Sequence, residues 1–250
     1  MAWRTKERAK SKARVDAANM TVVQHLTELR DRIFYSMLAV AVGAVICFVL
    51  FHWIIGFMVE PYKDITGQKG LIFTQPLEAF LTRMKVSAYG GLVLASPVVF
   101  WHLWRFITPG LYPKEKRYAI PFVVSSVVLF AGGAILSLLT FPRALEFLLG
   151  VGGENLQPLL SAGGYLSLVF LMAVSFGFAF EFPILVVFLL LARILTTAQL
   201  RHWRRIAFLA IVIIAAVVTP SQDPITLFAL AVPMYVLYEG AILVGRFTKR

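Results

Sequence analysis

Six apolar segments, separated by loops that are alternately rich and poor in Lys and Arg, constrain the fold of this chain more than any other feature. Of the 24 Lys and Arg residues, 19 lie in four basic stretches: 1–32, 102–117, 192–205 and 241–250. Because Lys and Arg resist translocation, basic loops stay on the cytoplasmic side of a membrane. The pattern predicts an all-α, polytopic membrane protein with six transmembrane helices and both termini in the cytoplasm.

The last two apolar segments are shorter than a bilayer requires. Residues 206–218 provide only 13 apolar positions, a helix about 20 Å long against a hydrocarbon core of roughly 30 Å. Such a hairpin thins the bilayer or sits recessed among longer neighbours, so we expect an open, concave bundle. In the turn before the last helix, Asp223 is expected to be the N-cap and Pro224 the first helical residue. The expected helical segments are 33–58, 76–104, 118–141, 165–191, 206–218 and 224–238.

The composition excludes a water-soluble globule. The chain is 59% hydrophobic and 15% charged, whereas about a quarter of the residues in soluble domains are charged. Topology and attraction to anionic lipid explain the net charge of +11, so nucleic acid is not an expected partner. Residues 1–20 contain no apolar signal-peptide core, and we expect them to form a basic cytoplasmic arm. The transmembrane domain is expected over 21–250.

A few charged residues lie inside the apolar segments. Glu181 is near the middle of the fourth segment, where a carboxylate must be protonated or face a polar cavity. It is either a structural carboxylate bonded to a neighbouring helix or a site for a polar group of a substrate or partner, and we favour the second interpretation. Pro183 is expected to kink this helix. Arg83 and Lys85 are expected to snorkel to the outer headgroups rather than form a buried ion pair.

Two clusters on the basic side of the membrane contain acids. Glu28 and Arg32, just before the first segment, form an i,i+4 pair, for which a juxtamembrane amphipathic helix is the simpler explanation. Glu115 is the only acid among the four bases of the loop 104–117. Both clusters lie on one side of the membrane, so Glu28 and Glu115 can converge. Paired carboxylates on a basic surface suit the binding of guanidinium groups.

The sequence contains no strong signal for an enzyme, a metal or a cofactor. Its four histidines show no HExxH spacing, and there is no GxSxG elbow. The single cysteine, Cys47, rules out an intrachain disulfide and a cysteine metal cluster. A small-solute secondary transporter is the competing class, but it would usually show an inverted repeat, and none is visible. An intramembrane protease would need a nucleophile–base pair.

Six motifs, in order along the chain, resemble the TatC family, the core subunit of the twin-arginine protein translocase. The resemblance extends from His25 to about Phe247. The motifs are His25-Leu26-x-Glu28-Leu29-Arg30-x-Arg32; Ser96-Pro97; Trp104-x-Phe106-Ile107-x-Pro109-Gly110-Leu111-Tyr112-x-x-Glu115; Phe180-Glu181-x-Pro183; Thr219-Pro220-Ser221-x-Asp223-Pro224; and Pro233-Met234-Tyr235-x-Leu237-Tyr238-Glu239.

The resemblance implies a receptor in the bacterial inner membrane that binds Arg-Arg signal peptides of folded cargo proteins. It also implies recruitment of single-helix TatA- and TatB-type partners into a multi-copy complex driven by the proton motive force. Twin-arginine recognition would fall on Glu28 and Glu115, with Arg30, Phe106 and Leu111 shaping the patch.

Further roles implied by the resemblance concern partner contact and assembly. Glu181 would make a polar contact with a partner helix inside the membrane. Tyr238 and Glu239 match a region of partner contact, and Pro220 and Asp223 match an outer turn involved in assembly.

Overall fold

The computed structural model describes residues 22–107, 119–152, 159–221 and 223–247, and these residues are almost entirely helical. They contain one isolated β-bridge, between Ile72 and Ser161, and no β-sheet. The all-α prediction is confirmed. The helices are α2 (Val22–Val49), α3 (Phe51–Thr66), α4 (Glu78–Ile107), α5 (Ala119–Val151), α6 (Ala162–Leu191), α7 (Thr197–His202), α8 (Arg204–Val218) and α9 (Pro224–Phe247).

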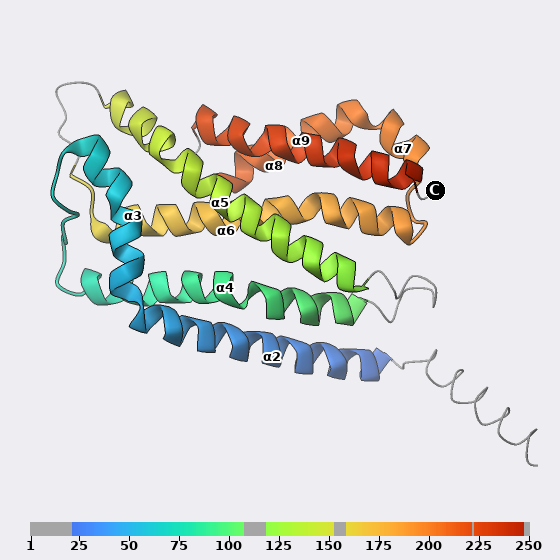
Figure 1. Cartoon of the computed structure of the whole chain (residues 1–250), viewed down its shortest axis with the longest axis horizontal. Helices are drawn as coiled ribbons and strands as arrows, with labels where there is room; N and C mark the ends of the chain where they lie inside the picture. The colour runs from blue at the N-terminus through green and yellow to red at the C-terminus, as the bar shows by residue number, and fades with distance from the viewer. Residues whose placement is uncertain (1–21, 108–118, 153–158, 222, 248–250) are drawn as a thin grey trace, which may run out of the picture.

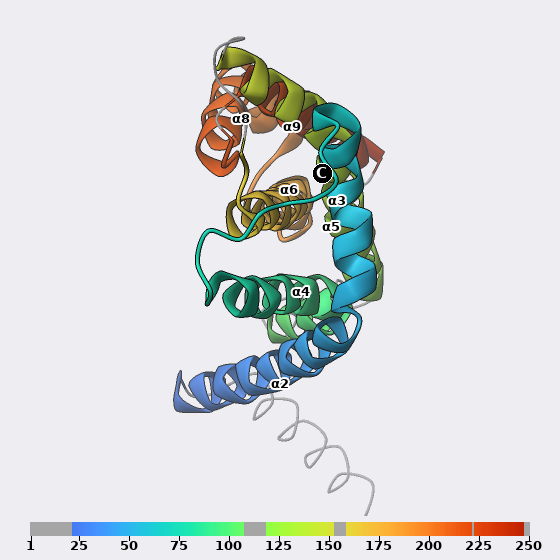
Figure 2. The ribbon, with the colours of Figure 1, turned by 90° about the vertical axis from the view of Figure 1, so that its left-hand side faces the viewer.

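Five of these helices, α2, α4, α5, α6 and α9, are long and apolar enough to cross a membrane. Helices α2, α4, α6 and α9 run side by side, α5 crosses them obliquely, and α3 lies across one end (Figure 1). Seen along the helices, α2, α4, α6 and α8 form a curved row, with α3 and α5 on one side (Figure 2). This arrangement agrees with an open, concave bundle.

The first segment differs from the predicted single helix over 33–58. Helix α2 starts earlier and ends at Val49, and the chain turns at Leu50 into α3, which contains Pro61. Gly67, in the left-handed conformation at φ 66°, ends α3. The region around Pro61 that was expected to be a loop is therefore helical.

Arg83 of α4 contacts both sides of this turn. Its Nη2 donates a hydrogen bond to the carbonyl oxygen of Phe48 at 2.9 Å, and its guanidinium lies 4.0 Å from the Phe48 ring centroid. A second ring, that of Phe51 at the start of α3, is 5.3 Å away. The side chain is held against the end of α2, and its snorkelling to the headgroups stays a prediction. Lys85 is exposed, as expected.

The last segment also differs from the prediction. Helix α9 continues beyond 224–238 and has 24 residues. Glu239, within this extension, pairs with Arg204 of α8 at 2.6 Å. Only α8, with 15 residues and a length of about 22 Å, remains shorter than the bilayer core. The predicted N-cap of α9 is confirmed, since the Thr226 amide donates to Asp223 Oδ1 at 2.8 Å.

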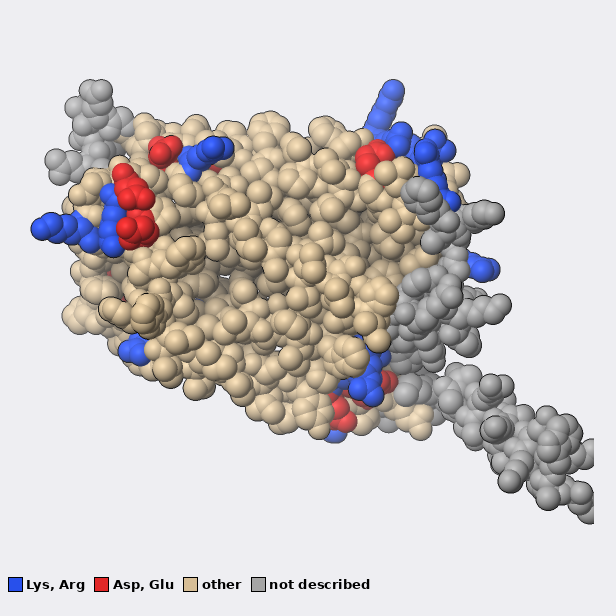
Figure 3. All heavy atoms as spheres, in the orientation of Figure 1, with Lys and Arg blue, Asp and Glu red and all other residues tan. Residues whose placement is uncertain are grey.

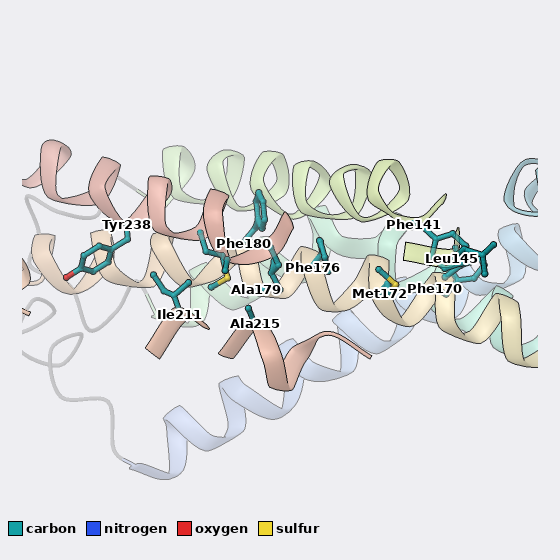
Figure 4. Packing of buried hydrophobic residues seen from close by; sticks show 14 of the residues in the cluster. Phe141, Leu145, Phe170, Met172, Phe176, Ala179, Phe180, Ile211, Ala215 and Tyr238 are labelled. Carbon is teal, nitrogen blue, oxygen red and sulfur yellow. The ribbon is translucent and has the colours of Figure 1, made fainter. Parts of the chain in front are cut away.

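Helix α6 forms the centre of the core, and most of its side chains are buried. Figure 4 shows Met172 and Phe176 of α6 in the same buried layer as Ile211 and Ala215 of α8. Helices α5 and α6 approach so closely that a Cβ on Gly133 would lie 2.5 Å from the Phe176 carbonyl oxygen. This close approach brings the polar side chains of α4, α5 and α6 together.

Candidate functional site

Charged side chains gather at the two ends of the helices, and an apolar band separates them (Figure 3). One end, which we call the basic end, holds the start of α2, the end of α4 and residues 193–205. Among the described residues it carries Arg30, Arg32, Arg105, Arg193, Arg201, Arg204 and Arg205. This separation is the arrangement expected of a protein that crosses a bilayer.

Glu28 at the basic end forms the predicted pair with Arg32. Both Nε, at 2.9 Å, and Nη2 of Arg32 donate to Glu28 Oε1. The two side chains are only 16% and 18% exposed. The second carboxylate oxygen, Oε2, is buried and has no hydrogen-bond partner among the described residues. Among the described residues, Arg32 therefore pairs with only one of the two Glu28 carboxylate oxygens.

Phe106 brings the end of α4 beside the start of α2. Its ring stacks on His25, with centroids 4.3 Å apart and planes 11° apart. Leu29, Arg32 and Phe106 line the same end of an apolar groove of about 470 Å³ between α2 and α4. Glu28, one residue before Leu29, is thus next to a surface that combines charge with apolar area.

Of the remaining residues predicted for signal-peptide binding, Arg30 lies in the described part of the chain, and it is not in this cluster. Arg30 is exposed and pairs with Asp31 at 2.9 Å, so its guanidinium does not contribute to the Glu28 pair. Glu115 and Leu111 lie outside the described residues. The convergence of Glu28 and Glu115 stays a prediction.

Glu181 lies on α6, deep in the apolar band. Its Oε1 is buried and has no hydrogen-bond partner among the described residues. On helix α5, which packs against α6, Ser126 is buried, and its hydroxyl oxygen accepts a hydrogen bond from the Trp104 indole of α4 at 2.8 Å. The expectation that Glu181 faces a concave groove stays a prediction. The groove between α6 and α8 is lined by neighbours of Glu181 on α6, such as Phe182.

Sequence reasoning did not place Ser126 and Trp104 in this site. Trp104 was noted only as part of a motif, and Ser126 lies among apolar residues of α5. The available signal was a hydroxyl in the middle of an apolar segment, which must find a partner when it is buried. The packing of α4 against α5 that brings Trp104 to Ser126 could not be inferred from the sequence.

Tyr238 and Glu239 connect α9 to α7 and α8. The buried Tyr238 hydroxyl donates to the Leu200 carbonyl oxygen at 2.8 Å. Glu239 accepts from Arg204 at 2.6 Å and from the Tyr235 hydroxyl at 3.3 Å. Both predicted partner-contact residues therefore have internal partners that fix the position of the short helix α8.

Asp223 is buried in the turn before α9, three residues beyond Pro220, the other residue predicted for the outer turn. Burial alone would raise the pKa of Asp223, but hydrogen bonds from Ser221 and Thr226 outweigh it and hold the pKa below its ordinary value. The charged carboxylate stabilises the start of α9 by accepting from the Thr226 amide and hydroxyl.

The described helices include five of membrane length, charged side chains gather at their ends, and Glu181 lies in the apolar band between. These features define a multi-pass membrane protein. Within the described ranges, no three His, Cys, Asp or Glu side chains are grouped to hold a metal ion. A family model described as Sec-independent protein translocase protein (TatC) matches residues 24–233. The chain belongs to the TatC family, and it is a component of a Sec-independent protein translocase rather than an enzyme.

Relatives and solved structures agree with this assignment. A Sec-independent protein translocase protein TatC of Frankia casuarinae is 42% identical over 248 residues, which cover 94% of this chain and 68% of that protein. The TatC of Aquifex aeolicus is 36% identical and covers 92% of this chain and 97% of its own length. A crystal structure of the twin-arginine translocase receptor TatC matches with a TM-score of 0.75 at 35% identity, over 90% of this chain and 100% of that one.

Proposed function

We propose that this protein is the receptor subunit of a twin-arginine translocase and that it binds Arg-Arg signal peptides at its basic end. The observation that carries the proposal is the half-paired carboxylate of Glu28, whose Oε2 is buried without a partner among the described residues. A peptide guanidinium would supply the missing donor. Both termini would then lie in the cytoplasm, and the chain would reside in a bacterial inner membrane.

The chemistry at Glu28 favours arginine over lysine. The planar guanidinium presents several donors in a fixed fork, whereas an ammonium is a compact point charge. Arg32 already pairs with Oε1, so an incoming guanidinium would pair with the buried Oε2. Phe106, stacked on His25 at 4.3 Å, offers a flat aromatic surface for the apolar part of the peptide. Glu115 would bind the second arginine, with Leu111 and Arg30 at the edge of the patch.

Partner recruitment is the second part of the proposal. Single-helix TatA- and TatB-type subunits would contact Glu181 within the membrane and the region of Tyr238 and Glu239, in a multi-copy complex that uses the proton motive force. The support is the buried, unpartnered Oε1 of Glu181 and the short helix α8, which leaves the apolar groove of about 620 Å³ between α6 and α8. Pro220 and Asp223 would serve assembly by fixing the turn that ends this groove.

The test is binding of an Arg-Arg signal peptide and its Lys-Lys variant to the purified protein. Glu28→Gln and Glu115→Gln should each weaken Arg-Arg binding about tenfold or more, because a hydrogen bond to a charged group contributes about 1.5–3 kcal/mol. The double variant should nearly abolish binding. Glu60→Gln is the matched control, since Glu60 lies on α3 at the opposite end and pairs with Lys63 at 3.1 Å. Wild-type affinity in the double variant would overturn the proposal.

A further inference from the structure

Helix α3 has one face packed on the bundle and one face uncovered. On the packed face, Tyr62 is 1% exposed and belongs to the main hydrophobic core. The Tyr165 hydroxyl of α6 donates to the Met58 carbonyl oxygen of α3 at 2.8 Å. At the start of the helix, the Phe51 ring lies against the Arg83 guanidinium, 5.3 Å from its centroid. These contacts fix which side of α3 points outwards.

The uncovered face begins with two large aromatic side chains. Trp53 is 80% exposed and Phe57, one helical turn further on, is 69% exposed. Between them, a Cβ on Gly56 would have no atom within 4 Å. The same face continues with Glu60 and Asp64, which are exposed and charged. Along this face, the helix therefore changes from aromatic to charged within about two turns.

The position of α3 in the molecule places this change of chemistry at the edge of the apolar band. Helix α3 lies across the ends of α2, α4 and α6 that are opposite the basic end (Figure 1), where charged side chains gather again (Figure 3). Trp53 closely follows the last residue of α2, Val49, which is itself exposed. The exposed apolar surface of α2 is thus continued along the chain by Trp53 and Phe57 before the charges begin.

We propose that Trp53 and Phe57 anchor α3 at the headgroup level of a phospholipid bilayer, on the side of the membrane opposite the basic end. Trp is favoured at this depth because its ring is apolar and its indole N–H needs a polar partner. Glu60 and Asp64 then face water. The inference rests on the membrane-spanning character of the chain and not on signal-peptide binding.

A second protein is a less suitable occupant of this face than lipid. Two aromatic side chains bury about 300–500 Å² at most, whereas a specific protein–protein interface buries about 800 Å² on each partner. The charged Glu60 and Asp64 adjoin the aromatic pair, and charged residues are depleted at the centre of protein interfaces. A lipid contact needs no such area, because five other helices are long and apolar enough to hold the chain in the bilayer.

The experiment measures the depth of a nitroxide spin label at position 56 of the full chain in phosphatidylcholine vesicles. Gly56→Cys places the label between Trp53 and Phe57 and keeps both rings, and Asp64→Cys, about two turns further on the same face, is the matched control. Wild type is the labelling blank, since its one cysteine, Cys47, is 2% exposed. Depth is reported by collisions with oxygen, which dissolves in the bilayer, and with a water-soluble nickel complex present on both sides of the vesicle membrane.

The ratio of oxygen to nickel collisions should be higher at position 56 than at position 64. When Trp53→Ala and Phe57→Ala are combined, the ratio at position 56 should fall to the value at position 64. Trp53→Phe should keep the ratio high, because an apolar ring remains. Both rings are exposed, so these variants should keep the wild-type unfolding midpoint.

Three outcomes would overturn the inference. The first is an equal ratio at the two positions while both aromatic rings are present, which would place the whole face in one environment. The second is a ratio at position 56 that does not change when both rings are removed. The third is spin–spin broadening at position 56, which would assign the face to a contact with a second copy of this chain.

Discussion

At the scale of single residues, Arg83 of α4 contacts the end of a different helix, α2. Arg83 donates to the Phe48 carbonyl at 2.9 Å and lies over the Phe48 ring, so it satisfies a backbone acceptor that α2 leaves open at its end. The same side chain contacts Phe51 at the start of α3. The turn at Leu50 thus depends on a residue about 35 positions further along the chain.

Replacing Arg83 tests this role. Arg83→Met should destabilise the protein by about 2 kcal/mol, because a charge-assisted hydrogen bond and a cation–π contact are both lost. Thermal unfolding in detergent would measure the change. Lys85→Met is the control, since Lys85 lies two residues away on the same helix and is exposed, and it should stay within about 0.5 kcal/mol of wild type. Equal effects of the two substitutions would contradict the assigned role.

At the scale of helices, the close contact between α5 and α6 requires a residue without a side chain, Gly133. A Cβ on Gly133 would lie 2.5 Å from the Phe176 carbonyl oxygen, whereas a Cβ on the adjacent Gly132 would have no atom within 4 Å. The obstacle at Gly133 is backbone, which cannot move aside cheaply.

The neighbouring glycines form a matched pair of variants. Gly133→Ala should destabilise the protein by about 1–3 kcal/mol through overpacking at the helix crossing. Gly132→Ala should be neutral or stabilise it by up to about 1 kcal/mol, because alanine is the better helix former. Unfolding midpoints measured side by side would test the pair. If both variants were equally stable, the close approach of α5 and α6 would not be essential.

The helices show how much the sequence could reveal. The long apolar runs predicted α4, α5 and α6 to within about ten residues at each end, and the capping role of Asp223 was predicted from its place before Pro224. The break between α2 and α3 at Leu50 was missed because Arg83, which contacts both sides of it, is on another helix. The extension of α9 was missed for the same reason, since Arg204 of α8 neutralises Glu239.

The candidate site shows the same limit. Glu28 and Arg32 were predicted to pair because their spacing is local, and the pair is confirmed. Glu181 was recognised because a carboxylate in an apolar segment is unusual in itself. Ser126 and Trp104 are 22 positions apart, and only the packing of α4 against α5 brings them to one another. Contacts between helices of this kind have no signature in the sequence of either helix.

At the scale of the whole molecule, the two polar sites are well separated. Glu28 is at the basic end, whereas Glu181 is ten residues before the end of α6, about 15 Å along the helix. Changes at Ser126 or Glu181 should therefore leave peptide binding at the basic end intact. In the proposed function, recognition of cargo at one end would be separate from contact with a membrane partner in the apolar band.

The most direct test of this account is a double-mutant cycle between Glu28 of the protein and the two arginines of a signal peptide. Affinities are measured for wild-type protein and Glu28→Gln, each with the Arg-Arg peptide and with peptides in which one Arg is Lys. We predict a coupling energy of at least about 1 kcal/mol between Glu28 and one of the arginines, the range seen for groups in contact. Strict additivity for both arginines, as expected for the control Glu60→Gln, would contradict direct recognition of the twin arginines by Glu28.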